Sequence, residues 1–125
     1  MTAEEVVSRL QGILAHLWMV RTFLKHAEEI QDDEDLLDVP RTLFDYVRAT
    51  EPAAQRNDTK EYLHRIRGKL PKLRRAAETL QNEYRRVSAH TNFEMAALSL
   101  TACVRQIDEV LATLARASTP SDPIG

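Results

Sequence analysis

The residue best suited to chemistry in this chain is His64, which opens the stretch HRIRGKLPKLRR over residues 64–75. Neutral imidazole is a nucleophile near pH 7, so an exposed histidine can form a covalent bond to a reacting group. Apolar residues recur around His64 at helical spacing, and His64 itself falls opposite the stripe they form. It can therefore be a reactive nucleophile or an ordinary exposed histidine.

The run from His64 through Ile66 and Arg67 to Gly68 resembles the short signature of histidine phosphotransfer domains, which are four-helix bundles of similar length. The resemblance implies that His64 takes a phosphoryl group from an aspartyl phosphate on a receiver domain. It also implies that Arg67 stabilises the phosphoryl charge and that Gly68 lets the receiver domain approach. This chain has Arg67 where the family usually has lysine, and Lys-Leu-Pro at residues 69–71 where the family usually has small residues.

Positive charge is concentrated in the middle of the chain. Residues 56–90 carry ten Lys or Arg against four Asp or Glu, a net charge of +6, whereas the whole chain has a formal net charge of −2. Such a face is either solvated or a docking surface for an acidic protein partner. Nucleic acid is disfavoured because no exposed aromatic side chains alternate with the cations. The candidate binding residues, with Lys69 at the border of the apolar stripe, are Arg65, Arg67, Lys72, Arg74 and Arg75.

A single helix is expected over residues 58–87, with Asp58 as its N-cap and Glu61 completing a capping-box pair. Gly68 and Pro71 are poor residues for a helix interior, and Pro71 has no N–H to donate to the carbonyl four residues earlier. The apolar stripe nevertheless continues on both sides of them. We therefore expect one continuous third helix that is kinked within a turn of Pro71.

Three further helices are expected over residues 2–30, 36–54 and 92–117, each with apolar residues at three-and-four spacing. Four helices with short connections predict an all-α, up-down-up-down four-helix bundle over residues 1–117. Residues 118–125 contain two prolines and no apolar pattern, so a disordered tail is expected there.

Local signals refine these helices. Thr2 with Glu5, and Thr91 with Glu94, have the spacing of capping boxes. The bundle topology also places the acidic turn over residues 31–38 at the same end as the basic residues that close the third helix, among them Arg85 and Arg86.

The first helix is apolar almost all round, because Trp18, Met19 and Phe23 lie off its core stripe. A helix of this kind is usually covered on every side, which predicts a homodimer with these three residues at or near the interface. Arg21 interrupts the core stripe. It is either buried and paired, or it extends along the surface to reach solvent.

Composition excludes several classes of protein. The one cysteine, Cys103, falls on an apolar face and cannot form an internal disulfide, which favours a cytoplasmic location. The acidic N-terminus has no signal-peptide pattern, and no apolar run is long enough to span a membrane. Glu61 with His64 is the only Glu-x-x-His pair, so no di-metal site is expected, although a metal near His26 and His90 stays open.

The sequence thus predicts a non-enzymatic helical bundle without cofactor or metal, which docks an acidic protein partner through the basic face of its third helix. The alternative is a phosphotransfer module that uses His64.

Overall fold

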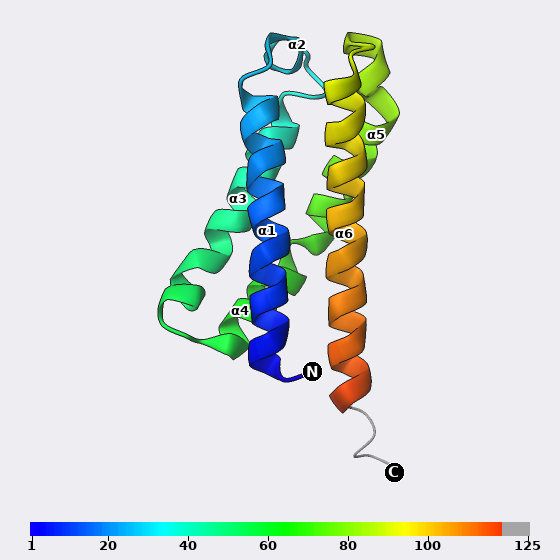
Figure 1. Cartoon of the computed structure of the whole chain (residues 1–125). Helices are drawn as coiled ribbons and strands as arrows, with labels where there is room; N and C mark the ends of the chain where they lie inside the picture. The colour runs from blue at the N-terminus through cyan, green and yellow to red at the C-terminus, as the bar shows by residue number, and fades with distance from the viewer. Residues whose placement is uncertain (119–125) are drawn as a thin grey trace.

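The computed structural model describes residues 1–118, which form six helices and contain no strand (Figure 1). This confirms the predicted all-α class. The predicted tail beyond Ser118 lies outside the described residues, and Ser118 itself ends the last helix. The helices are α1 (Ala3–Lys25), α2 (Glu28–Gln31), α3 (Asp38–Gln55), α4 (Thr59–Gly68), α5 (Leu70–Val87) and α6 (Thr91–Ser118).

The long helices pack side by side with alternating chain direction. In Figure 1, α1 rises from the N-terminus, α3 returns, α4 and α5 rise again, and α6 descends beside α1. α1 and α5 each contact both α3 and α6, and α4 contacts α3 and α1. The register of α1 against α6 is set by Phe23, whose ring meets Phe93, and by Cys103, whose sulfur lies 3.9 Å from the carbonyl of Ile13. Side chains that are fully enclosed between the helices include Leu10, Leu17, Leu43, Leu73, Leu80, Leu100 and Ile107.

Helix starts agree with the sequence in two places out of three. Thr2 and Glu5 form the predicted capping box, and Asp58 accepts the N–H of Glu61 at 3.1 Å. The third prediction is wrong, because α6 already begins at Thr91. The imidazole of the preceding residue, His90, supplies the acceptor instead: its Nδ1 takes the backbone N–H of the residue after Thr91 at 3.0 Å.

The first helix is shorter than expected. α1 ends at Lys25, the chain turns at His26 and Ala27, and the separate short helix α2 follows. The acidic turn after α2 lies against the end of α5, where Arg86 pairs with Asp33 and Asp35. This confirms that the acidic turn and the basic end of the third predicted helix share one end of the molecule.

The expected single helix over residues 58–87 is instead two helices, α4 and α5, which meet at Lys69. Pro71 has no N–H for the carbonyl of Arg67, and that carbonyl accepts the N–H of Lys69 instead. The carbonyl of Ile66 accepts the hydroxyl of the buried Tyr46 on α3 at 2.7 Å. The chain does not reverse here, because α4 and α5 both pack along α3. The one carbonyl that loses its donor to the proline, that of Arg67, thus finds another donor, and the Ile66 carbonyl is bonded to α3.

Candidate functional site

His64 lies near the middle of α4 (Thr59–Gly68), and its side chain is exposed. No hydrogen bond involves the imidazole within residues 1–118. Arg67 and Gly68 are also exposed and follow at the spacing that shares one side of a helix. A Cβ added at Gly68 would meet no atom within 4 Å beyond the adjacent residues and the backbone of its own helix, so the backbone there is open to an approaching surface. The three residues of the phosphotransfer resemblance are therefore accessible together, but α4 ends at Gly68.

Two of the five predicted binding residues form ion pairs within the chain. Arg65 pairs with Glu61 in the preceding turn at 2.7 Å. One nitrogen of Arg74, Nη2, donates to both carboxylate oxygens of Asp108 on α6, at 2.7 and 2.8 Å. Both arginines thus already have a carboxylate partner within the fold, and their binding to another protein stays a prediction.

Four cations around the break between α4 and α5 make no ion pair in the described part of the chain, and we call them the basic strip: Arg67, Lys69, Lys72 and Arg75. All four are exposed. Lys69, Lys72 and Arg75 are three residues apart, the spacing of neighbours on a helix surface. Lys69 and Lys72 line a hollow of about 180 Å³ with Asp45 of α3. On the single helix expected from the sequence, Lys69 lies at the border of the apolar stripe. In the structure it lies at the junction of α4 and α5 and is exposed.

The predicted interface residues of α1 are largely used inside the chain. The Trp18 ring lies 5.6 Å from that of Phe44 on α3, and the Phe23 ring lies edge-on at 5.1 Å from that of Phe93 on α6. Both side chains are partly buried. Met19 alone stays open, with 66% of its surface exposed. A homodimer through α1 thus retains one of its three expected anchors.

Arg21 contacts two aromatic rings and forms no ion pair within residues 1–118. It is partly buried, and its guanidinium lies 4.5 Å from the centre of the Trp18 ring and 4.9 Å from that of Phe44. Aromatic faces attract a cation and leave its N–H groups available. The sequence allowed two interpretations of Arg21, a buried ion pair or a side chain that extends to solvent. Neither of them included the contacts with Trp18 and Phe44.

Cys103 is enclosed in the core, and burial raises the pKa of its thiol to about 11. A thiol with this pKa is almost entirely protonated at neutral pH and is a poor nucleophile. Residues 1–118 contain no group of three or more His, Cys, Asp or Glu side chains placed to hold a metal ion. Over the same residues, the helices are too short or too polar to cross a membrane.

Comparison of this chain with protein-family models, with curated proteins and with solved structures finds no match. Function must therefore be inferred from the chain itself.

Proposed function

We propose that this protein is a non-enzymatic four-helix bundle of the cytoplasm that docks an acidic protein partner through the basic strip. The alternating directions of α1, α3, α4 with α5, and α6 support the bundle (Figure 1). In this arrangement α4 and α5 together are the third helix of the bundle and α2 belongs to a connection. The bundle serves as a rigid support for the strip.

The observation that carries the proposal is the contrast between paired and unpaired cations. Arginines on α3, α4, α5 and α6 form ion pairs within the chain, as Arg48 does with Glu51 and Arg74 with Asp108. The basic strip is clustered at a helix break and stays without such pairs in the described chain. Clustered like charges repel, and an acidic partner would relieve that repulsion while gaining attraction of its own.

The test is binding of a labelled peptide rich in Glu and Asp, measured by fluorescence anisotropy. Changing Lys69, Lys72 and Arg75 to Gln is expected to weaken binding about tenfold, because each exposed charge contributes roughly 0.5 kcal/mol. Added salt should weaken the wild-type complex in the same way.

The matched control removes three exposed charges elsewhere, through Arg9→Gln, Arg48→Gln and Arg105→Gln. It gives the same net charge and should change the affinity less than about twofold. Equal losses in the two variants would mean that only total charge matters, and the strip would not be a docking site. Tighter binding of single-stranded DNA of matched charge than of the acidic peptide would favour nucleic acid over a protein partner.

A second candidate function is phosphotransfer, which the open imidazole of His64 and the open backbone at Gly68 favour. A ring nitrogen of His64 would attack the phosphorus of a receiver's aspartyl phosphate. The nitrogen–phosphorus bond forms as the phosphorus–oxygen bond to the aspartate breaks, and the ring proton is lost to solvent. Arg67, three residues on, is close enough along the helix to stabilise the transferred charge.

The decisive variant is His64→Gln, which should abolish acid-labile labelling by a panel of phosphorylated receiver domains and leave acidic-peptide binding unchanged. His16→Gln is the control, because His16 is also an exposed histidine within a helix. Labelling that survives in His64→Gln, or wild-type protein that takes no label from any receiver, would end the phosphotransfer proposal.

A further inference from the structure

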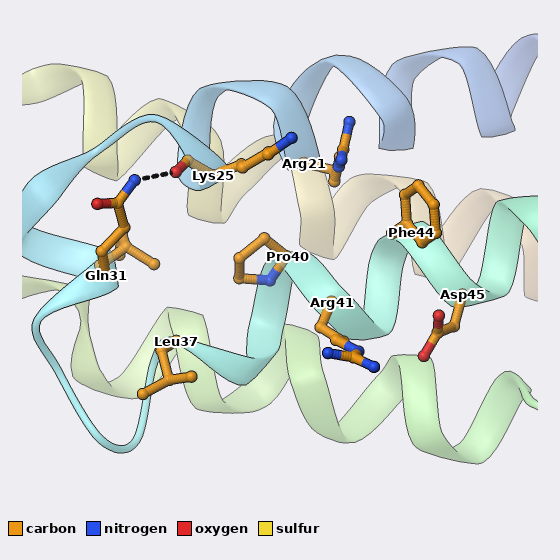
Figure 2. A pocket seen from close by; sticks show the side chains of 9 residues that line it. Arg21, Lys25, Gln31, Leu37, Pro40, Arg41, Phe44 and Asp45 are labelled. Carbon is orange, nitrogen blue, oxygen red and sulfur yellow. Dashed lines mark hydrogen bonds between the residues drawn. The ribbon is translucent and has the colours of Figure 1, made fainter.

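A second group of unpaired cations lies around a pocket between α1, α2 and α3 (Figure 2). The pocket has a volume of about 480 Å³. Sites for small organic molecules typically measure about 300–1,000 Å³. The amide of Gln31 donates to the backbone carbonyl of Lys25, and this bond ties α2 to the end of α1 as one wall. The pocket is thus built by three segments rather than by a gap along one helix.

The charges on the pocket wall are unbalanced. Arg21 and Lys25 come from α1, and Arg41 comes from the first turns of α3. Asp45 is the one carboxylate among the lining residues. None of the three cations forms an ion pair within residues 1–118, so the formal charge of the lining is three minus one, or +2. An anion would be attracted to this wall.

Arg21 is the cation best placed to hold a ligand. Its guanidinium lies beside the rings of Trp18 and Phe44, which are themselves 5.6 Å apart, and is partly buried. A planar guanidinium with free N–H groups matches the two oxygens of a carboxylate. Because the rings already hold this side chain in place, little conformational entropy is lost when a ligand binds.

The remaining wall is apolar. Ile30 and Pro40 are buried, and Phe44 is partly buried, while Leu37 is 44% exposed at the start of α3. Water contact with such a leucine is unfavourable, and a ligand body that covers it would gain hydrophobic free energy. The wall therefore combines a cationic part with an apolar part.

We infer that this pocket binds a small amphipathic carboxylate, with its charged end at Arg21 and Lys25 and its acyl or aromatic body on Leu37, Pro40 and Phe44. Charge complementarity selects an anion, and the apolar wall selects a ligand with a hydrophobic body over a simple inorganic ion. The pocket shares Asp45 with the hollow beside the basic strip, but no cation lines both, so variants of the cations test the two sites separately.

The experiment compares octanoate with octan-1-ol, which has the same apolar chain and no charge. Trp18 is the only tryptophan of the chain and stacks on Arg21, so its emission should change when octanoate binds. Octanoate is expected to bind wild-type protein about tenfold more tightly than octanol, and salt should reduce that advantage. Amide chemical shifts should move at the end of α1 and the start of α3.

Variants assign the effect to residues. Arg21→Gln and Lys25→Gln, assayed by amide shifts, should each lower octanoate affinity about tenfold while octanol binding is unchanged. Lys25 is exposed, so its variant keeps the fold even if Arg21→Gln does not. Arg48→Gln is the control: Arg48 also lies over the Phe44 ring, at 5.6 Å, but it does not line the pocket.

Three results would overturn the inference. The first is wild-type protein that shows no saturable change with millimolar octanoate, and the second is octanol that binds as tightly as octanoate. The third is an Arg48→Gln variant that loses as much octanoate affinity as Lys25→Gln does. Saturable, carboxylate-dependent binding that is lost on changing Lys25 would support it.

Discussion

Replacing Tyr46 by phenylalanine is expected to destabilise the fold by about 1–3 kcal/mol, the usual cost of leaving a buried polar group without its partner. The Tyr46 hydroxyl donates to the carbonyl of Ile66 at 2.7 Å, and both residues are almost fully buried. Burial raises the pKa of the Tyr46 hydroxyl, so it keeps its proton and stays a donor throughout the neutral range. The change would be measured by urea unfolding followed by circular dichroism.

Tyr84→Phe is the matched control for this substitution. Tyr84 is also a buried tyrosine, but within residues 1–118 its hydroxyl accepts only from the exposed Arg85, at 3.2 Å, and water can replace that contact. Its loss should cost less than about 0.5 kcal/mol. Equal losses for the two variants would show that the bond to Ile66 contributes nothing special.

Tyr46→Phe should also weaken acidic-peptide binding, because the bond from Tyr46 to Ile66 fixes the break on which the basic strip lies.

The break between α4 and α5 shows what the sequence could and could not predict. Apolar spacing and caps such as Asp58 are local signals, and they identified the all-helical class and the starts of α1 and α4. The end of α4 depends on Tyr46, which is twenty residues away from Ile66 in sequence. A proline indicates that a helix is disturbed. Only the tertiary partner decides whether the result is a kink or a break.

The same limit explains the candidate sites. The pair of Arg65 with Glu61 has an i, i+4 spacing and could have been predicted from the sequence. The pair of Arg74 with Asp108 spans 34 residues and could not. The sequence singled out Arg21 as unusual, but its aromatic neighbour Phe44 is on another helix. Unpaired cations become visible only when the paired ones are known.

The ion pairs of Arg86 with Asp33 and Asp35 in the acidic turn should make the stability of the fold depend on pH in the acidic range. Asp33 accepts hydrogen bonds from Arg86 and from the backbone N–H groups of Asp35 and Leu36. The Arg86 side chain is the main cause that holds the pKa of the Asp33 carboxyl below its usual value. A lowered folded-state pKa means that the stabilisation is complete above the unfolded pKa, about 3.9 for Asp, and is lost as pH falls through the folded pKa.

Arg86→Gln should therefore lower the thermal midpoint at pH 7, and the gap to wild type should shrink as pH falls below about 4. In the variant the pKa of Asp33 should rise toward its usual range and stop short of it, because the two backbone N–H groups still favour the charged carboxylate. Carboxyl NMR titration measures that pKa directly. Arg85→Gln is the control, since this substitution removes an equal charge one residue away. The Arg85 side chain donates to the Tyr84 hydroxyl rather than to a carboxylate. A gap between Arg86→Gln and wild type that stays constant into acid would show that Arg86 stabilises the turn by packing and not through the charge of Asp33.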